Sequence, residues 1–152
     1  FSGATFTQDA DFSRATFTQT AYFSGATFTQ DADFSRATFT QDADFSRATF
    51  TQNADFSEAT FSASSPKFVE ISKALELTFR ARFATLPKNQ RADSFTVSEG
   101  SFPILLGEAE LGDGIKHHIP VGTVLFDPSS EETSEPAKPL DKSNDGEEEK
   151  PE

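Results

Sequence analysis

The sequence of 152 residues contains no cysteine, no methionine and no tryptophan, and it has a single tyrosine. Without cysteine the chain has no disulfide framework, no thiolate ligand for a metal ion and no thiol nucleophile. It also lacks any stretch that approaches the roughly 18 consecutive apolar residues of a membrane-spanning helix. These absences exclude a disulfide-stabilised domain, a zinc–thiolate centre and a helical membrane span. They leave the localisation of the protein undetermined.

Side chains that carry out catalysis are also scarce. His117 and His118 are the only histidines. Because neighbouring residues of a strand face opposite sides, the two cannot bind one metal ion together, and we expect both at the surface. The motifs G-x-S-x-G, G-x-x-x-x-G-K-[S/T] and H-E-x-x-H are absent. We therefore predict a protein that is not an enzyme and that has no cofactor and no metal site.

Basic residues are few as well. The net charge of the chain is −12, of which residues 1–62 carry −5, residues 63–128 carry −1 and residues 129–152 carry −6. No basic patch exists, so we expect no nucleic-acid binding by charge. The last segment has one large apolar residue, Leu140. It cannot bury enough surface to offset its ordering entropy, so we expect residues 129–152 to be a disordered acidic tail.

Phenylalanine, in contrast, is abundant. It recurs at alternating steps of five and six residues from Phe1 to Phe61, within the repeating unit A-T-F-T-Q-D-A-D-F-S-R. A fixed period of this kind is the signature of a stacked repeat architecture. We predict that the following residues form its structural core: Phe6, Phe12, Phe17, Phe23, Phe28, Phe34, Phe39, Phe45, Phe50, Phe56 and Phe61.

The repeat predicts strands and not helices. A five-residue step turns the next phenylalanine about 140° around a helix, so no apolar stripe forms. In a strand, Ala4 and Phe6 instead face inward while Thr5 and Thr7 face outward. Each half-unit is then one side of a coil, and four sides make a coil of 22 residues. Coils stack at the roughly 4.8 Å spacing of neighbouring strands.

This unit resembles the five-residue repeat A-[D/N]-[L/F]-x-x of the pentapeptide-repeat family. The segments at 10–14, 32–36 and 43–47 match it directly, and the copies that begin like Ala4 carry threonine in second position. An extra residue in every second unit, such as Asp9, departs from the family pattern. The resemblance covers residues 1–62 and implies an all-β fold, a right-handed quadrilateral β-helix with alanine and phenylalanine inside. Because the chain begins in mid-repeat, we expect more coils upstream.

Residues 63–128 leave the register of the repeat. Ser64-Ser65-Pro66 favours the start of a short helix, and the alternation from Leu75 to Phe83 predicts a half-buried strand with a charged outer face. Further strands are expected at 94–97, 102–106, 108–111, 115–119 and 121–126. We predict a short helix or turn followed by a small antiparallel β unit. It would cover the open end of the solenoid, whose unpaired backbone groups invite aggregation.

Three interpretations of function follow from the repeat and its charge. The first, which needs nothing beyond the repeat, is a structural or protein-interaction module with an unknown protein partner; self-association is left open. The second is mimicry of DNA, because some pentapeptide-repeat proteins resemble a duplex closely enough to occupy topoisomerases. Three coils rise about 14 Å, a length over which B-DNA carries about eight phosphates. Arg14, Arg36 and Arg47 interrupt the carboxylates of the solenoid, which argues against mimicry.

A third interpretation is ice binding, because regular Thr-x-Thr arrays on β-solenoids resemble the ice-binding faces of antifreeze proteins. The candidate surface ladder consists of Thr5, Thr7, Thr27, Thr29, Thr49 and Thr51. Threonine is also favoured at exposed strand positions, and threonines pair well across strands. Folding alone is therefore sufficient to explain the ladder, and ice binding is kept as an alternative.

Overall fold

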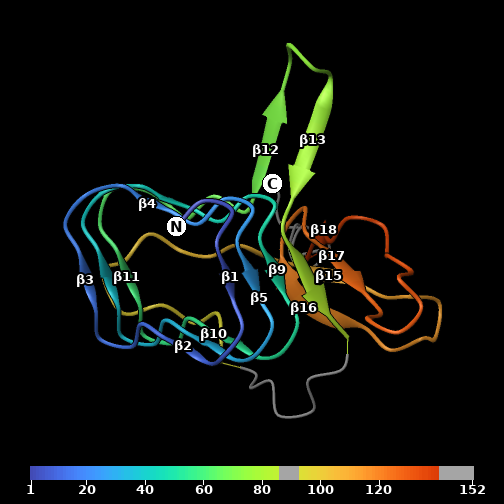
Figure 1. Ribbon diagram of the computed structural model, residues 1–152, viewed down its shortest axis with the longest axis horizontal. Coiled ribbons are helices and arrows are strands. Elements are labelled where there is room, and N and C mark those ends of the chain that lie inside the picture. Colours follow the sequence, from blue (N-terminus) through green and yellow to red (C-terminus); the bar gives the residue numbers. More distant parts are fainter. Residues whose placement is uncertain (86–92, 141–152) are drawn as a thin grey trace, which may run out of the picture.

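The computed structural model describes residues 1–85 and 93–140, and within these ranges it contains strands and no helix (Figure 1). The strands of the repeat are β1 (Thr5–Phe6), β2 (Ala10–Asp11), β3 (Thr16–Phe17), β4 (Ala21–Tyr22), β5 (Thr27–Phe28), β6 (Ala32–Asp33), β7 (Thr38–Phe39), β8 (Ala43–Asp44), β9 (Thr49–Phe50), β10 (Ala54–Asp55) and β11 (Thr60–Phe61). The later strands are β12 (Val69–Ser72), β13 (Leu77–Arg80), β14 (Arg82–Ala84), β15 (Leu106–Ala109), β16 (His117–Pro120), β17 (Val124–Phe126) and β18 (Lys138–Pro139).

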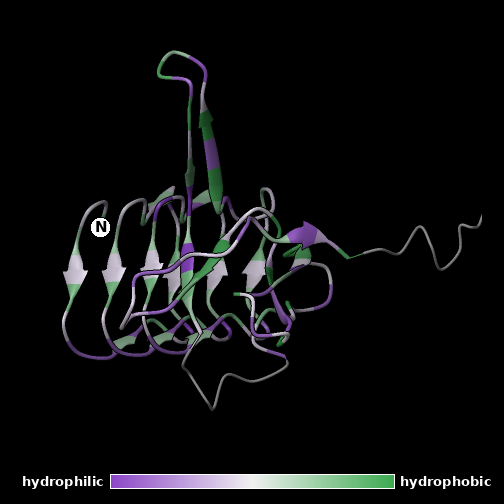
Figure 2. Cartoon of the chain, turned by 90° about the vertical axis from the view of Figure 1, so that its right-hand side faces the viewer, coloured by the Kyte–Doolittle hydropathy of each residue, from purple (hydrophilic) through white to green (hydrophobic). Residues whose placement is uncertain are grey.

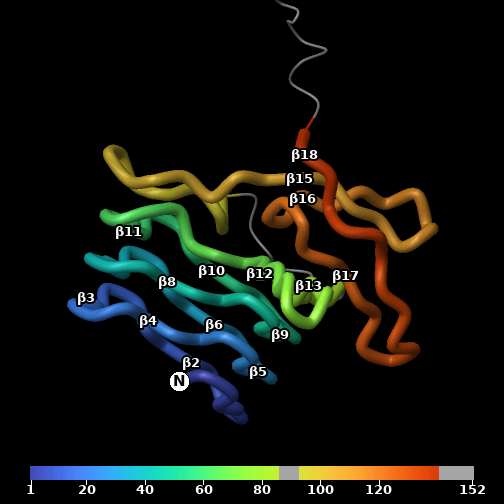
Figure 3. The backbone as a smooth tube through the Cα atoms, turned by 90° about the horizontal axis from the view of Figure 1, so that it is seen from above, coloured from blue at the N-terminus to red at the C-terminus, as the bar shows by residue number. Residues whose placement is uncertain are grey.

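The strands of the repeat stack into four parallel walls. Their orders are β1-β5-β9, β2-β6-β10, β3-β7-β11 and β4-β8. The register advances by one 22-residue coil, so that Thr27 lies between Thr5 and Thr49. Backbone groups pair from coil to coil, for example Thr27 N to Ala4 O at 2.8 Å. Figure 3 shows these coils side by side from above. The predicted all-β solenoid is confirmed.

Phenylalanine rings fill the space between the walls. Phe34 is fully buried and lies nearly parallel to Phe12 and Phe56, with 5.1 Å between ring centroids in both cases. Its ring meets Phe45 of the neighbouring column at 5.3 Å and 83°. Near-parallel and edge-to-face pairs are the arrangements that the quadrupoles of aromatic rings favour. In the first coil the rings are less enclosed, and Phe1 is 60% exposed.

The chain continues the solenoid after residue 62 without forming the predicted short helix. Lys67 N donates to Ala43 O at 2.8 Å, Phe45 N donates to Lys67 O at 2.6 Å, and the ring of Phe68 stacks on that of Phe45. The helix prediction at 64–66 is therefore wrong. Pro66, Lys67 and Phe68 follow the small–polar–Phe order of the repeat, and the stacking of Phe68 overrides the local helix-start signal.

Later aromatic residues extend two more columns. Phe83 stacks on Phe50 at 4.9 Å, and Phe95 stacks on Phe56 at 6.0 Å. β14 and β17 join the wall β1-β5-β9 in parallel, so this wall has five strands. The predicted antiparallel β segment is confirmed by β15 and β16. The antiparallel pairs β12–β13 and β15–β18 include strands that were not predicted, and β14 and β17 pair in parallel.

An antiparallel hairpin of β12 and β13 projects from one corner of the solenoid (Figures 1 and 2). Its ends are held together by a hydrogen bond from Ala81 N to Phe68 O at 2.9 Å. In the coil below, Ala48 N makes the equivalent bond to Phe45 O at 3.1 Å. Only two residues lie between this closing pair in the coil below. The equivalent position between Phe68 and Ala81 is occupied by residues 69–80, which we call the hairpin arm.

The predicted continuous strand from Leu75 to Phe83 is wrong. The alternating residues belong to two separate strands, one in the hairpin arm and one in a wall of the solenoid. β13 ends at Arg80 and pairs with β12, whereas β14 begins at Arg82 and pairs with β9 and β17. Leu75 is consequently 64% exposed on the arm, while Phe83 is buried in the solenoid.

The C-terminal sheet places β15 between β16 and β18. β15 and β16 correspond to the strands predicted at 108–111 and 115–119, shifted by up to two residues. Gly107 of β15 lies close to the backbone of β18, because a Cβ atom at this position would approach Lys138 O to 2.5 Å. Only glycine allows the two strands to approach this closely.

Residues 129–140, the start of the predicted tail, are ordered in the structure, which corrects that part of the prediction. Ser134 N donates to Leu125 O at 2.9 Å and Ala137 N donates to Thr123 O at 2.7 Å, so this segment covers the outer edge of β17. Backbone hydrogen bonds to an open edge order a segment that has little apolar surface of its own. The predicted disorder of residues 141–152 lies outside the described residues.

The stacked core gives a direct stability test in Phe34→Ala. The substitution leaves a cavity between Phe12 and Phe56, and we expect it to lower the free energy of unfolding by about 3–5 kcal/mol. Gln30→Ala, at an exposed position of the same coil, should change it by less than about 0.5 kcal/mol. Chemical denaturation followed by circular dichroism measures both values. Equal effects of the two substitutions would contradict the role of the Phe34 column.

Candidate binding surfaces

One type of corner in the solenoid is closed by an aspartate and a serine. Asp33 Oδ1 accepts a hydrogen bond from Ser35 N at 2.9 Å. The same contact recurs at Asp11, Asp44 and Asp55. The next residue after the serine adopts a left-handed backbone, with φ of 59° at Arg36, a conformation that costs a non-glycine residue about 1 kcal/mol. The recurring aspartates therefore stabilise the corner.

One unit of the repeat lacks the aspartate, and its sequence indicates that the aspartate stabilises the corner. The alternation of inward and outward residues does not reveal this role. Tyr22 replaces the aspartate in that unit, and the left-handed residue of its corner is Gly25, with φ of 72°. Glycine adopts this conformation without the steric cost of a Cβ atom. Where the left-handed corner residue is arginine or glutamate, the unit thus has the aspartate. Where the aspartate is missing, the left-handed residue is glycine.

Acidic side chains line a shallow depression of about 240 Å³ on the wall β2-β6-β10. Its polar residues are Asp9, Asp11, Asp31, Asp33, Asn53 and Asp55. Several carboxylates are already engaged: Asp9 Oδ1 accepts from Asp31 N, and Asp31 Oδ1 accepts from Asn53 N, both at 3.2 Å. Within residues 1–85 and 93–140, no group of three or more His, Cys, Asp or Glu residues is arranged to hold a metal ion.

Two of the three arginines predicted to interrupt this negative surface lie beside it. Arg14 and Arg36 line an adjacent depression of about 280 Å³. Arg36 Nε lies 2.9 Å from Glu58 Oε1, at an exposed position where such an ion pair contributes little stability. The carboxylates of the solenoid therefore alternate with positive charge along this corner.

The threonines of the candidate ladder stack in columns along the wall β1-β5-β9. Thr5, Thr27 and Thr49 pair in register, as the period of the repeat requires. The second threonine of a unit is engaged with the backbone, because Thr29 Oγ1 donates to Phe6 O at 2.9 Å. At the end of the ladder, Arg82 replaces threonine, and its Nε lies 3.3 Å from Thr49 Oγ1. The ladder is thus short and partly used to bind successive coils together.

The two histidines lie on β16 with unequal exposure. His118 is exposed and pairs across the sheet with Glu108, with 3.5 Å between Nε2 and Oε2. His117 is half-buried and pairs with Ala109. Neighbouring positions of the strand therefore separate the two rings, and only His118 belongs to the charged face.

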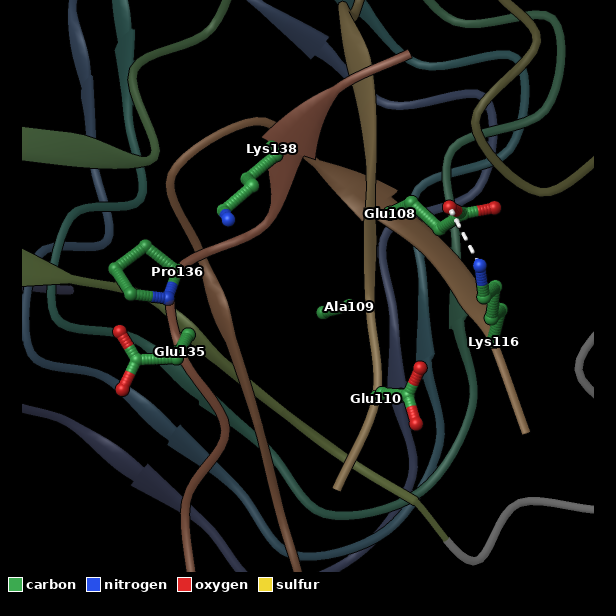
Figure 4. A pocket seen from close by; sticks show the side chains of 7 residues that line it. All are labelled: Glu108, Ala109, Glu110, Lys116, Glu135, Pro136 and Lys138. Atoms are coloured by element: carbon green, nitrogen blue, oxygen red, sulfur yellow. Dashed lines mark ion pairs between the residues drawn. The ribbon is translucent and has the colours of Figure 1, made fainter. Parts of the chain in front are cut away.

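That charged face borders an open depression of about 310 Å³, shown in Figure 4. Glu108 and Lys116 lie together on one side, with 3.7 Å between Oε1 and Nζ, while Glu135 and Pro136 lie on the other. The lining side chains are Glu108, Ala109, Glu110, Lys116, Glu135, Pro136 and Lys138. Three carboxylates and two ammonium groups at an open surface form a solvated charge network and not an enclosed ligand site.

The hairpin arm differs from these polar surfaces because it exposes apolar side chains. Ile71 is 70% exposed, Leu75 is 64% exposed and Leu77 is 51% exposed. Much of the arm is accordingly coloured as hydrophobic in Figure 2. These side chains lie on a projection of the chain that no other described segment covers (Figures 1 and 2).

Contacts at its base fix the arm to the body of the protein. Arg80 Nη1 donates to Gly122 O at 2.7 Å, on the side of the C-terminal segment. On the side of the solenoid, the guanidinium of Arg47 lies over the ring of Phe79, 4.6 Å from its centroid. A cation–π contact of this kind contributes about 0.5–1 kcal/mol at an exposed site. The base is therefore held on two sides while the tip is uncovered.

Comparison with known families agrees with the repeat. Residues 1–49 match the family model for pentapeptide repeats, in nine copies. This part of the chain consists of pentapeptide repeats, and the predicted family is confirmed. No curated protein and no solved structure matches the chain significantly. In the described ranges, no helix is long and apolar enough to cross a membrane.

The pairing of aspartate with a left-handed corner residue is testable by a double-mutant cycle. Asp33→Ala removes a hydrogen bond to a charged acceptor, and we expect a loss of about 1–2 kcal/mol of stability. The loss should be smaller when Arg36→Gly is also present, because glycine favours the corner without help. Denaturation of the single and double variants measures the coupling. Strictly additive effects would show that the two positions are independent.

The corner also predicts a pH dependence at Asp11. Hydrogen bonds from Ser13 Oγ and Ser13 N lower the pKa of this carboxyl group below its usual 3.8. The stabilisation is therefore complete above the unfolded value of 3.8 and is lost as the pH falls through the lower folded pKa. In Ser13→Ala we expect the pKa of Asp11 to rise toward 3.8. An NMR titration of the side-chain carboxyl carbon of Asp11 measures it, and an unchanged pKa would contradict the assignment.

Proposed function

We propose that this chain is a non-catalytic protein-interaction module in which a rigid solenoid holds the hairpin arm in place for contact with another protein chain. The observation that carries the proposal is the exposure of Ile71, Leu75 and Leu77 on the arm. Apolar side chains grouped at the tip of a projection are typical of contact sites with other proteins.

The body of the protein supports this role as a rigid support. Fully buried rings run through successive coils, and a single ordered core of this kind resists bending. The arm leaves this core at a corner whose closing bond, Ala81 N to Phe68 O, is the same as in the regular coils. The position of the arm relative to the walls is therefore determined by the packing of Phe68 and Phe83.

The polar surfaces support the two alternative functions less well. For mimicry of DNA, Arg14 and Arg36 border the acidic wall, and several of its carboxylates accept backbone hydrogen bonds. For ice binding, Thr29 and Thr40 use their hydroxyl groups to donate to carbonyl groups of the neighbouring coil. Neither surface offers the exposed apolar area of the arm.

Removal of the arm tests the proposal. We expect that replacing residues 69–80 by Ser-Gly, a corner of the type found at Ser24-Gly25, preserves the solenoid, because the Phe68–Ala81 closure remains. Circular dichroism and the melting temperature report whether the fold persists. A photo-crosslinker at Leu75 should form protein adducts in an extract of the source organism, and one at the exposed Gln30 should not.

The outcome of this pair of experiments is decisive for the proposed role. Adducts at Leu75 that are absent at Gln30, together with an intact fold after removal of the arm, are the expected result. No adduct at Leu75, or equal adducts at both positions, would show that the arm is not a contact element. Unfolding after the replacement would instead assign the arm to the stability of the solenoid.

A further inference from the structure

The outer edge of β13 carries free backbone hydrogen-bonding groups. The bond from Ala81 N to Phe68 O fixes the phase of the hairpin. Since hydrogen-bonded pairs alternate along an antiparallel ladder, the backbone groups of Leu77 and Phe79 face β12, and those of Thr78 and Arg80 face away from it. In the described ranges β12 and β13 form a separate two-stranded sheet, so no third strand occupies this edge.

A two-stranded sheet that stands apart from the body is an unusual arrangement. Isolated hairpins are marginally stable, and three or more strands are generally needed for an independent sheet. A free edge that has apolar side chains also promotes pairing with another strand. Leu77 and the turn residue Leu75 expose such side chains beside the edge of β13.

The sequence of β13 is complementary to itself when a second copy pairs with it in antiparallel orientation. With Thr78 opposite Thr78 of the second copy, Leu77 lies opposite Phe79 and both pairs are apolar. The ladder consists of residues 77–79, because Glu76 lies in the turn with a left-handed backbone, φ of 54°, and Arg80 is bound to Gly122 O at the base of the arm. The two-fold axis passes between the two Thr78 residues, so the pair of Leu77 with Phe79 occurs twice.

The edge of β12 lacks this complementarity. Its outward-facing residues are Val69 and Ile71, and a symmetric pairing about Ile71 places Val69 opposite Lys73 and Glu70 opposite Ser72. That arrangement offers one apolar pair, formed by Ile71 of each copy, whereas the edge of β13 offers two. The residue pattern therefore distinguishes the two edges of the arm.

From this we propose that two copies of the chain associate through the outer edges of β13, in antiparallel orientation about Thr78, to form a four-stranded sheet. This proposal rests on the proposed function, in which the arm is a contact element, and it names a second copy of the chain as the partner. The exchange of backbone hydrogen bonds at Thr78 gives the association its register, and the apolar pairing of Leu77 with Phe79 favours this register over others.

A single cysteine at the centre of the interface tests the register directly, because the chain contains no native cysteine. Opposed Cα atoms in a hydrogen-bonded antiparallel pair lie about 5.5 Å apart, which is within the span of a disulfide. We expect Thr78→Cys to form a disulfide-linked dimer rapidly under mild oxidation of the purified protein. Ile71→Cys on the opposite edge and Gln30→Cys on the solenoid should crosslink much more slowly.

Proline at the same position separates association from folding. The N–H group of Thr78 faces away from β12, so Thr78→Pro removes a donor of the interface but none of the hairpin. We expect the wild-type chain to sediment as a dimer at about 100 μM, where even a weak micromolar interface is occupied. Thr78→Pro should sediment as a monomer with an unchanged circular dichroism spectrum.

The results of these experiments discriminate between this proposal and the proposed function. A monomeric wild-type chain at about 100 μM, or crosslinking of Ile71→Cys as fast as Thr78→Cys, would overturn the association through β13. If the chain is monomeric and the photo-crosslinker at Leu75 labels a different protein, the arm remains a contact element with another partner. If it is monomeric and binds phosphatidylcholine vesicles through the arm, both proposals fail.

Discussion

The stacking of each phenylalanine on its equivalent one coil away is the interaction on which the structure depends. The ring of Phe23 lies 5.2 Å from that of Phe45 with an angle of 3° between the planes, and Phe28 repeats this on Phe50 at 5.0 Å. Because the rings occupy the interior completely, the walls can only align with equivalent residues above one another. Backbone hydrogen bonding between coils follows from this alignment, and so does the repetition of every surface side chain in a column.

The same constraint explains why the first part of the fold could be predicted from the sequence. In a solenoid with a constant period, residues that are neighbours in space are separated by that period in the chain. The spacing of Phe12, Phe34 and Phe56 in the sequence therefore directly predicts that their rings are in contact. Composition and alternation were sufficient to identify strands, inward residues and the family of the repeat.

The later part escaped prediction because insertions remove the period while the packing continues. Phe68, Phe83 and Phe95 occupy the same columns as the repeat phenylalanines, but the hairpin arm separates Phe68 from Phe83 in the chain. The order of residues 129–140 was missed for another reason. Their contacts with β17 are mostly backbone hydrogen bonds, which do not require particular side chains and are therefore not recognisable in the sequence. Prediction of the surfaces was limited similarly: the threonine and aspartate columns were visible, whereas their bonds to the backbone were not.

The closed corner beneath the hairpin arm has a consequence for how such a protein can change over evolutionary time. The closing bond is made across two residues between Ala48 N and Phe45 O, and across a complete hairpin between Ala81 N and Phe68 O. A corner of this kind tolerates insertion of a segment whose ends are close together, as those of the hairpin arm are. New binding loops can therefore be acquired one corner at a time, while the coils on either side retain their sequence and their packing.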